Sequence, residues 1–406
     1  MKYAPILLLV LAFACGPQRE ETIYWQSIED DLQTLLIQAQ DGDTINIPAG
    51  YYMFTNPLIL DGISNLVFQG QGMDETILSF EMQESGAEGI RAANCTNLTF
   101  RDFTIQDAPG DNIKVTDTDG VRFARVTSKW SGEPSEENGA YAFYPVLCKR
   151  VIVENCLAIG SSDAGIYVGQ SDRVIIRNNE VYHNVAGIES ENSRWVEIYG
   201  NNAHDNTGGI LIFDMPGLTQ SGHTTRVYDN DVISNNHDNF APEGNVVAVV
   251  PPGTGIMMMA TRNIEVFNNR IHHNRTIGTA LASYVLVEAL GAEEGSQLEE
   301  VNQTINEDYD PYPNQVYFHH NEFKNKHVLP TLKNDFGLLF LTYFTFSLPD
   351  FAMDGILPPD KDFVLCLSNN GEFNFANIDA ENDFENRSTD WSAYACDFGT
   401  IDPIFQ

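Results

Sequence analysis

Short runs in which apolar and polar residues alternate recur along the chain at a nearly constant interval. The glycines of the Gly-Ile pairs at 165, 187 and 209 are 22 residues apart, and the steps from Ile90 to Ile113 and from Phe143 to Ile166 are 23 residues. Each interval holds three such runs, separated by Asn, Gly, Asp or Ser. Period-two alternation indicates β-strands, and three strands with three turns per repeat are typical of one coil of a parallel β-helix. The pattern therefore predicts an all-β fold, a single parallel β-helix.

Aligning the coils predicts two columns of stacked side chains. The inward apolar column consists of Ile90, Ile113, Phe143, Ile166, Ile188, Ile210 and Ile256. A column at one turn consists of Asn179, Asn201, Asn230, Asn269 and Asn321. Stacked amides can hydrogen-bond along the axis and satisfy turn backbone groups that would otherwise be unpaired. We therefore expect these asparagines to be structural.

The N-terminal part predicts a cap on the solenoid. Residues 27–39 are amphipathic and precede DGDTINIPAG at 41–50. A helix over the open end shields the apolar core and blocks pairing of the edge strand. These residues resemble the start of pectate-lyase-like right-handed β-helix proteins. The resemblance implies a right-handed coil with an N-terminal helix cap.

Later segments resemble an uncharacterised bacterial family of exported parallel β-helix proteins. The segments are SDAGIYVGQS at 162–171, AGIESENS at 186–193, GGILIFDMPG at 208–217 and NFAPEGNVVAVVPPGTGIM at 239–257. This resemblance covers roughly residues 25–325 and concerns the fold. It implies little about activity, because the superfamily includes lyases, hydrolases, epimerases, esterases and non-enzymes.

The N-terminus predicts export. An apolar run from Ala4 to Ala14 follows Met1-Lys2; it is too short to span a bilayer but suits a signal peptide. The small residues before Cys15 resemble a bacterial lipoprotein signal, although Ala12 stands where such signals usually carry Leu. This resemblance implies lipidation of Cys15 and an extracytoplasmic protein anchored to a membrane. Ordinary cleavage after Ala14 is the alternative.

Four segments follow from these patterns: a signal peptide at 1–15, a polar tether at 16–24, the β-helix at 25–330 and a C-terminal cap at 331–406. Insertions at 131–139 and 287–314 interrupt the repeat. The apolar stretch 336–348 is rich in Phe, Tyr and Thr, which favours a buried strand.

Charge and cysteine content narrow the classes of partner. The net charge of −35 repels nucleic acid and anionic lipid surfaces, and suits solubility or bound cations. Five cysteines after Cys15 are too few for a disulfide scaffold. Cys366 and Cys396 can pair, whereas Cys95, Cys148 and Cys156 look like small buried residues.

Candidate chemistry lies on the outward positions of the strand that begins at each Gly-Ile pair. One outward column reads Arg91, Lys114, Tyr144, Tyr167, Glu189, Leu211 and Met257, and the next reads Ala93, Thr116, Val146, Gly169, Glu191, Phe213 and Met259. Gln170, Asn192 and Asp214 follow at the adjoining turn, and Asp163 precedes Gly165. The prediction is an exposed strip along a groove, running from basic through aromatic to acidic residues.

This strip suits a carbohydrate chain. Tyrosine faces stack on sugars, Arg91 and Lys114 can hold a uronate, and Gln170, Asn192 and Asp214 can bind hydroxyls. Glu189 and Glu191 lie about 6.5–7 Å apart by strand rise, a spacing that suits two-carboxylate glycoside hydrolysis.

A second possibility for the strip is a metal site. Asp163, Glu189, Glu191 and Asp214 can bind Ca²⁺, which would acidify a uronate's C5 proton for elimination or epimerisation. Lys114, Tyr144 or Tyr167 would then act as base. The structural alternative is that the polar residues only solvate an exposed sheet.

Two functions remain open from the sequence. One is an exported lyase or epimerase, ahead of a hydrolase, acting on an acidic polysaccharide. The other is a non-catalytic envelope lipoprotein that binds a glycan, a metal or a partner protein. Basic residues near the carboxylates favour the first.

Overall fold

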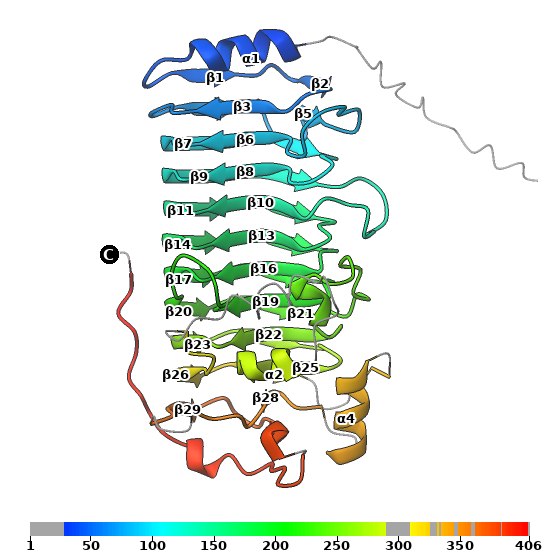
Figure 1. The fold of residues 1–406 in the computed structure, drawn as a ribbon, viewed down its shortest axis with the longest axis vertical. Coiled ribbons are helices and arrows are strands. Elements are labelled where there is room, and N and C mark those ends of the chain that lie inside the picture. The colour runs from blue at the N-terminus through cyan, green and yellow to red at the C-terminus, as the bar shows by residue number, and fades with distance from the viewer. Residues whose placement is uncertain are drawn as a thin grey trace, which may run out of the picture.

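The structure is a computed structural model that describes residues 28–289, 309–324, 331–332, 334–344, 348–358, 362–382 and 384–404. These residues form a parallel β-helix whose coils stack along one axis (Figure 1). We name its three stacks of strands the first, second and third sheets. Cys15, the signal peptide at 1–15 and the tether at 16–24 lie outside the described residues.

The first sheet contains the strands that begin at the Gly-Ile pairs. Its members are β3 (Leu58–Asp61), β6 (Ile90–Ala93), β8 (Ile113–Thr116), β10 (Tyr141–Val146), β13 (Ala164–Gly169), β16 (Ala186–Glu191), β19 (Gly208–Phe213), β22 (Thr254–Met259), β25 (Ile277–Ala282), β28 (Phe351–Met353) and β30 (Phe375–Asn377).

The second and third sheets share two long strands, β7 (Thr96–Gln106) and β9 (Asp119–Lys129), which turn the corner between them. The second sheet also holds β1 (Thr44–Asn46), β4 (Val67–Gln69), β11 (Lys149–Glu154), β14 (Asp172–Arg177), β17 (Arg194–Tyr199), β20 (His223–Tyr228), β23 (Arg262–Phe267), β26 (Asn314–His319) and β29 (Leu365–Ser368). The third holds β2 (Gly50–Met53), β5 (Thr76–Ser79), β12 (Leu157–Ile159), β15 (Glu180–Tyr182), β18 (Asn202–His204), β21 (Asp231–Ile233), β24 (Arg270–His272) and β27 (Glu322–Lys324).

The coils stack in the register that the sequence predicts. Ile188 pairs with Ile166 on one side and with Ile210 on the other, and Ile210 pairs with Ile256. All seven residues of the inward column are completely buried. The predicted column is therefore confirmed, and it forms part of one apolar core that runs the length of the solenoid.

The predicted asparagine column is also confirmed, as a hydrogen-bonded ladder. The Asn201 carboxamide oxygen accepts from the Asn179 backbone N–H (3.0 Å) and side-chain Nδ2 (2.9 Å). The Asn201 Nδ2 donates in turn to Asn230 Oδ1 and to the Ile176 carbonyl. The ladder continues through Asn269 and Asn321 to Asn370. Each amide thus satisfies backbone groups at a buried corner that water does not reach.

A second asparagine ladder, which the sequence analysis did not identify, lines the corner between the third and first sheets. It consists of Asn184, Asn206, Asn235 and Asn274, all completely buried. The signal was present in the sequence, because Asn184 and Asn206 also lie 22 residues apart.

The N-terminal cap is confirmed as α1 (Glu29–Gln38), which buries Leu32 and Leu36 against the first coil. Its Gln33 side chain bonds both the N–H (2.9 Å) and the carbonyl (3.0 Å) of Ile59 in the edge strand β3. The helix thereby covers the core and occupies backbone groups on which another strand would otherwise pair.

The C-terminal part departs from two expectations. Strands β28, β29 and β30 continue the first and second sheets, so the β-helix extends beyond the boundary placed at residue 330. Residues 335–343 form a helix, α4 (Asp335–Tyr343), where a strand was predicted. The Asn334 side chain caps this helix by accepting from Gly337 N–H (2.8 Å), and Phe340 packs with Ile277 and Ala352. The high content of Phe, Tyr and Thr favoured a strand, but the helix cap and this packing stabilise a helix instead.

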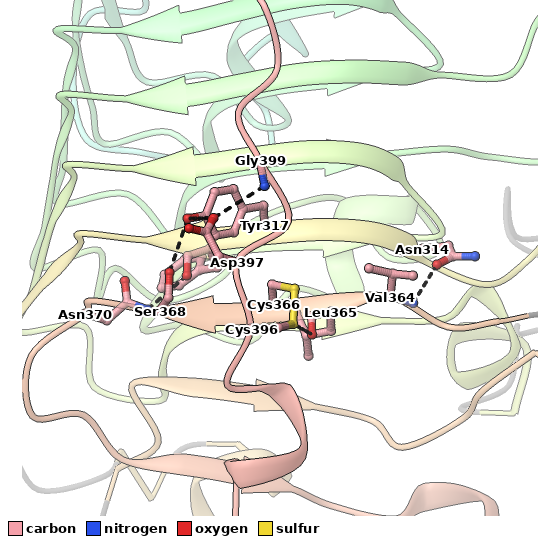
Figure 2. The surroundings of a disulfide bond; sticks show 11 residues. Asn314, Tyr317, Val364, Leu365, Cys366, Ser368, Asn370, Cys396, Asp397 and Gly399 are labelled. Carbon is pink, nitrogen blue, oxygen red and sulfur yellow. Dashed lines mark hydrogen bonds between the residues drawn. A yellow bond between two sulfur atoms is a disulfide. The ribbon is translucent and has the colours of Figure 1, made fainter.

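Residues 396–404 run back across the second sheet, and we call them the strap (Figures 1 and 2). A disulfide joins Cys396 to Cys366, and the Asp397 carboxylate accepts from the Tyr317 hydroxyl (2.8 Å). The pairing that the sequence left open is therefore present. Cys95, Cys148 and Cys156 are free and buried, as expected.

The strap also bonds to two buried glutamates. The Ile401 and Ile404 backbone N–H groups donate to Glu265 (3.1 Å) and Glu197 (2.9 Å). These glutamates lie two coils apart, about 9.6 Å, which matches three residues of extended chain at about 3.3 Å each.

The remaining described helices are short: α2 (Tyr284–Ala289), η1 (Val246–Val249), η2 (Ala380–Asn382) and η3 (Ser392–Tyr394). Among the residues that the structure describes, no helix is long and apolar enough to cross a membrane.

The asparagine ladder can be tested by substitution. Asn201→Ala removes the acceptor of Asn179 and leaves buried turn groups unpaired, so we expect the free energy of unfolding to fall by about 1–2 kcal/mol. Chemical denaturation measures this change. Asn202→Ala, whose side chain lies outside the ladder, is the control, and an Asn201→Ala protein as stable as its parent would show that the ladder does not contribute.

Candidate active site

The two outward columns lie side by side on the first sheet, as the sequence predicts. Lys114 pairs with Arg91 and with Tyr144 in register, and Tyr167 pairs with Glu189. Glu191 lies opposite Gly169. Because neighbouring strands are about 4.8 Å apart, these side chains form one continuous strip along the axis.

The strip is exposed only at its N-terminal end, so the prediction of a solvated groove is wrong for its C-terminal half. The Lys114 side chain is 27% exposed and Arg91 lies at the surface. Tyr167 and Glu189 are each only 4% exposed, and Leu211 is fully buried. From β19 onward the strip residues Leu211, Phe213 and Met257 pack in a second apolar cluster with Val247 and Val250. The covering residues come from the insertion between β21 and β22, whose position the coil repeat does not specify.

Three tyrosine rings meet above β10 and β13. The Tyr144 ring centroid lies 4.3 Å from that of Tyr141 and 5.0 Å from that of Tyr167, and Tyr141 and Tyr167 are 4.8 Å apart. Sequence analysis missed Tyr141, because strict alternation with the inward Phe143 would place it in the core. The alternation breaks at this position, since Ala164, its partner in the next coil, also packs on the outer face.

The tyrosines hold two of three gathered carboxyl groups. The Tyr141 hydroxyl donates to Asp163 Oδ2 (3.0 Å), and the Tyr167 hydroxyl donates to Glu191 Oε2. The other oxygen of Asp163 and the Oε2 of Glu189 are buried and have no hydrogen-bond partner among the described residues. A buried carboxylate without a partner is costly, which favours its protonated form.

This setting raises the pKa of all three carboxyl groups. Burial, with repulsion from Glu191 and Asp111, raises the pKa of Asp163 to about 7, although the Tyr141 hydrogen bond opposes the shift. Burial and the charges of Asp163 and Glu191 raise the pKa of Glu189 well above its usual value. Burial also raises the pKa of Glu191, against the effect of the Tyr167 hydrogen bond. The three groups therefore share fewer than three negative charges near neutral pH.

The phenols in the cluster remain protonated. Burial and the neighbouring carboxylates raise the pKa of Tyr141, Tyr144 and Tyr167 far above neutrality. A phenol of high pKa is a poor base, which argues against the predicted role of Tyr144 or Tyr167 in abstracting a proton.

The Lys114 amine lies between two carboxylates and an aromatic ring at the open end of the strip. Its Nζ lies 3.6 Å from Glu88, 3.5 Å from Asp111 and 4.8 Å from the Tyr144 ring centroid. Burial raises the pKa of Asp111 to about 6, while Lys114 lowers it. These contacts occupy the Lys114 amine and leave Arg91 as the more open cation of the pair.

Gln170, Asn192 and Asp214, predicted to bind substrate, instead hold the loop 215–222. Gln170 Oε1 accepts from Thr219 N–H (2.9 Å), and Asn192 Nδ2 donates to the carbonyls of Met215 (2.9 Å) and Gln220 (2.8 Å). Asp214 is fully buried and accepts from Gly222 N–H (2.7 Å). Burial raises the pKa of Asp214 to about 7.

The four carboxylates predicted to bind calcium do not form a preformed metal centre. Within the described parts of the chain, no group of three or more His, Cys, Asp or Glu is arranged to hold a metal ion. Calcium binding by Asp163, Glu189, Glu191 and Asp214 stays a prediction.

Comparison with known proteins agrees with this architecture. Residues 65–217 match the family described as "Right handed beta helix region". The A-module of the mannuronan C-5 epimerase AlgE4 from Azotobacter vinelandii is 15% identical, with a TM-score of 0.51 over 85% of this chain and 91% of that one. The chain thus has the right-handed parallel β-helix fold of the pectate-lyase-like proteins.

Two further solved structures share this broad likeness. A hyperthermoactive exopolygalacturonase from Thermotoga maritima is 11% identical, with a TM-score of 0.47 over 85% of this chain and 88% of that one. DFA-IIIase from Arthrobacter chlorophenolicus A6, in a structure without its lid, is 12% identical, with a TM-score of 0.46 over 84% of this chain and 90% of that one. No curated protein matches the sequence.

The raised pKa of Asp163 predicts a pH-dependent stability. Its folded pKa of about 7 exceeds the ordinary value of 3.8, so its contribution is fully present below about pH 4 and is lost as pH rises through 7. In Asp163→Asn, which keeps an acceptor for Tyr141, we expect the unfolding free energy to fall less over this range. Denaturation at successive pH values measures the slope, with exposed Asp117→Asn as control; equal slopes in all three proteins would contradict the assignment.

Proposed function

We propose that this chain is an exported carbohydrate-active enzyme in which the carboxyl groups of the cluster Asp163, Glu189 and Glu191 donate a proton to the substrate and accept one from water. The observation that supports this proposal is the burial of three carboxyl groups with raised pKa values, two of which carry unpartnered oxygens among the described residues. A carboxylic acid that stays protonated near neutral pH can donate a proton, and an ionised neighbour can accept one. Acid–base pairs of this kind are typical of glycoside hydrolysis.

The contacts favour distinct roles. Glu191 is the most accessible of the three and accepts a hydrogen bond from Tyr167, which favours its ionised form. Glu189, with an unpartnered oxygen and a pKa that burial raises well above its usual value, favours the acid role. In the proposed reaction the acid protonates the glycosidic oxygen as the bond from that oxygen to C1 breaks. The base accepts a proton from the water whose oxygen bonds to C1.

The open end of the strip supports an acidic glycan as substrate. Arg91 is exposed, and the Tyr144 ring, two coils further along the strip, is partly exposed. A guanidinium pairs with a sugar carboxylate, and an aromatic face packs against a sugar ring. Hydrolysis is favoured over elimination or epimerisation, because two carboxylates occupy the Lys114 amine and the tyrosines keep their protons.

The second candidate is a non-catalytic envelope lipoprotein that binds a glycan, a metal or a partner protein. The burial of Tyr167 and Glu189 favours this candidate, because each side chain is only 4% exposed and a glycan has little access to them. Calcium binding at the four carboxylates belongs to this candidate as well as to a lyase.

Activity on a panel of uronate-containing polysaccharides tests the proposal. Reducing-end detection reports hydrolysis, and absorbance at about 235 nm reports the unsaturated product of elimination. We expect the parent to release reducing ends and Glu189→Gln or Glu191→Gln to lower kcat by about 10² to 10⁴-fold, the usual contribution of an acid or base.

Asp117→Asn, a surface change on the same solenoid, controls for general effects and keeps parental activity. A parent that is inactive on every polysaccharide, with or without Ca²⁺, would reject the enzyme. A Ca²⁺-dependent rise in melting temperature that Glu189→Gln/Glu191→Gln abolishes would then support the binding protein.

We also propose that the protein is lipid-anchored at Cys15 outside the cytoplasm. The Cys366–Cys396 disulfide supports export, because such bonds persist in oxidising compartments. The partners we propose are therefore a polysaccharide or an envelope protein, and not nucleic acid, in keeping with the net charge of −35.

Cys15→Ser tests the anchor. Without a thiol to lipidate, we expect the protein to move from the membrane fraction to the soluble fraction of cells in which it is expressed. Fractionation with an antibody to the β-helix measures this, and Cys95→Ser, which replaces a buried thiol, is the control. Unchanged membrane partitioning of Cys15→Ser would reject lipidation.

A further inference from the structure

The open part of the strip ends at the carboxyl groups. On the N-terminal side, Arg91, Lys114 and Tyr144 follow one another on successive coils and keep contact with solvent. On the next coil beyond the carboxylates, Leu211 lies opposite Glu189 and Phe213 opposite Glu191. These two side chains are 0% and 2% exposed. The strip therefore closes between Tyr144, which is partly exposed, and Leu211, through the two coils of Tyr167 and Glu189, which are each only 4% exposed.

The closure is built by residues 235–252, which we call the cover. Val247 and Val250 of the cover pack in one apolar cluster with Leu211, Phe213 and Tyr167. Gly208 lies directly below this contact, since a Cβ there would meet Val250 Cγ1 at 3.1 Å and Leu211 Cδ2 at 3.2 Å. The cover thus occupies the space above β19 that a sugar ring would need.

Internal hydrogen bonds hold the cover in shape. The Asn239 carboxamide donates to the carbonyls of Val247 (3.0 Å) and Val250 (2.9 Å) and accepts from Ala241 N–H (2.9 Å). The cover is tied to the solenoid where His237 N–H donates to the Asn206 carbonyl (3.0 Å) and Thr207 Oγ1 donates to the Asp238 carbonyl (3.2 Å). Because of these bonds, the cover forms a fixed wall of the strip.

The side of the strip is closed at the same level. Gln170, Asn192 and Asp214 hold the loop 215–222 against the turn that follows β13, β16 and β19. The Tyr309 hydroxyl adds a bond to the Asp214 carbonyl (2.7 Å). A linear chain lying along the strip can thus enter from the N-terminal coils, but cannot pass beyond Glu191.

We propose that the site receives the end of a glycan chain, so that the enzyme acts on terminal sugars and not on internal linkages. This inference rests on the function proposed above. The open part of the strip, from β6 to β10, spans two coil steps, about 9.6 Å, and holds the sugars on one side of the scissile bond. Leu211, Phe213, Val247 and Val250 determine the specificity by blocking sugars on the other side.

Product lengths from a defined oligosaccharide test the proposal. The probe is a uronate hexamer prepared from the polysaccharide that the panel identifies, labelled at its reducing end and followed by electrophoresis from the earliest times. The parent should yield products by successive loss of one terminal unit, and the viscosity of the polymer should fall slowly. A spread of internal products at the earliest times would overturn the inference while leaving the proposed enzyme intact.

Two variants locate the block. Replacing residues 240–249 by two glycines opens the cover, and Val247→Ser/Val250→Ser weakens it with less risk to folding. We expect both to add internal products to the terminal ones, whereas Ile37→Ser on the distant helix α1 leaves the pattern unchanged. Terminal products alone from folded forms of both cover variants would overturn the assignment of these residues.

Binding distinguishes the failure of this inference from that of the proposed function. A further outcome is that the parent binds glycan without turning it over. In that case, recognition of chain ends predicts that the binding of polymers of different length depends on the molar concentration of chain ends and not on the mass concentration of polymer. Binding that follows mass would overturn the inference. No binding and no turnover of any glycan would remove the proposed function and, with it, this inference.

Discussion

In-register stacking of parallel coils is the constraint on which the rest of this molecule depends. Each residue lies about 4.8 Å from its equivalents in the coils above and below, so every side chain must be compatible with a copy of its own position. Inside, this produces a continuous apolar column from Ile90 to Ile256. At the buried corners it produces two ladders of asparagine, because only a side chain with both a donor and an acceptor can satisfy the backbone and pass the hydrogen bond onward.

The same register has opposite consequences for charge on two faces. On the second sheet, successive coils alternate in sign: Arg226 bonds Glu197 (3.1 Å) and Glu265 (3.1 Å), and Glu154 lies between Arg122 and Arg177. These contacts, with those to His319, hold the pKa of Glu265 below its usual value despite its burial. On the first sheet, three buried carboxyl groups gather beside tyrosines instead of arginines, and their pKa values rise. A cluster that gives up stability in this way is typical of a functional site.

Departures from the repeat turn the regular strip into an enclosed site. The cover at 235–252 and the loop 215–222 are insertions between coils, and they bury the C-terminal half of the outward columns. The strap lies across the alternating charges of the second sheet, where its backbone N–H groups donate hydrogen bonds to Glu197 and Glu265. The solenoid therefore supplies a fixed spacing of side chains, and the insertions determine which of them solvent or a ligand can reach.

The sequence by itself determined the coil, the register and the members of the predicted columns, because period-two alternation and a repeat of 22 or 23 residues are local properties of the chain. It placed Glu189 and Glu191 on one face for the same reason. Tertiary structure decided the rest. Tyr141 lies in the site because the alternation breaks at its position. Gln170 and Asn192 bind a loop instead of facing the strip. Residues 335–343 form a helix because of its cap and its packing against residues distant in the sequence. Burial, and with it the raised pKa of the carboxyl groups, depends on segments far away along the chain, whose position no repeat specifies.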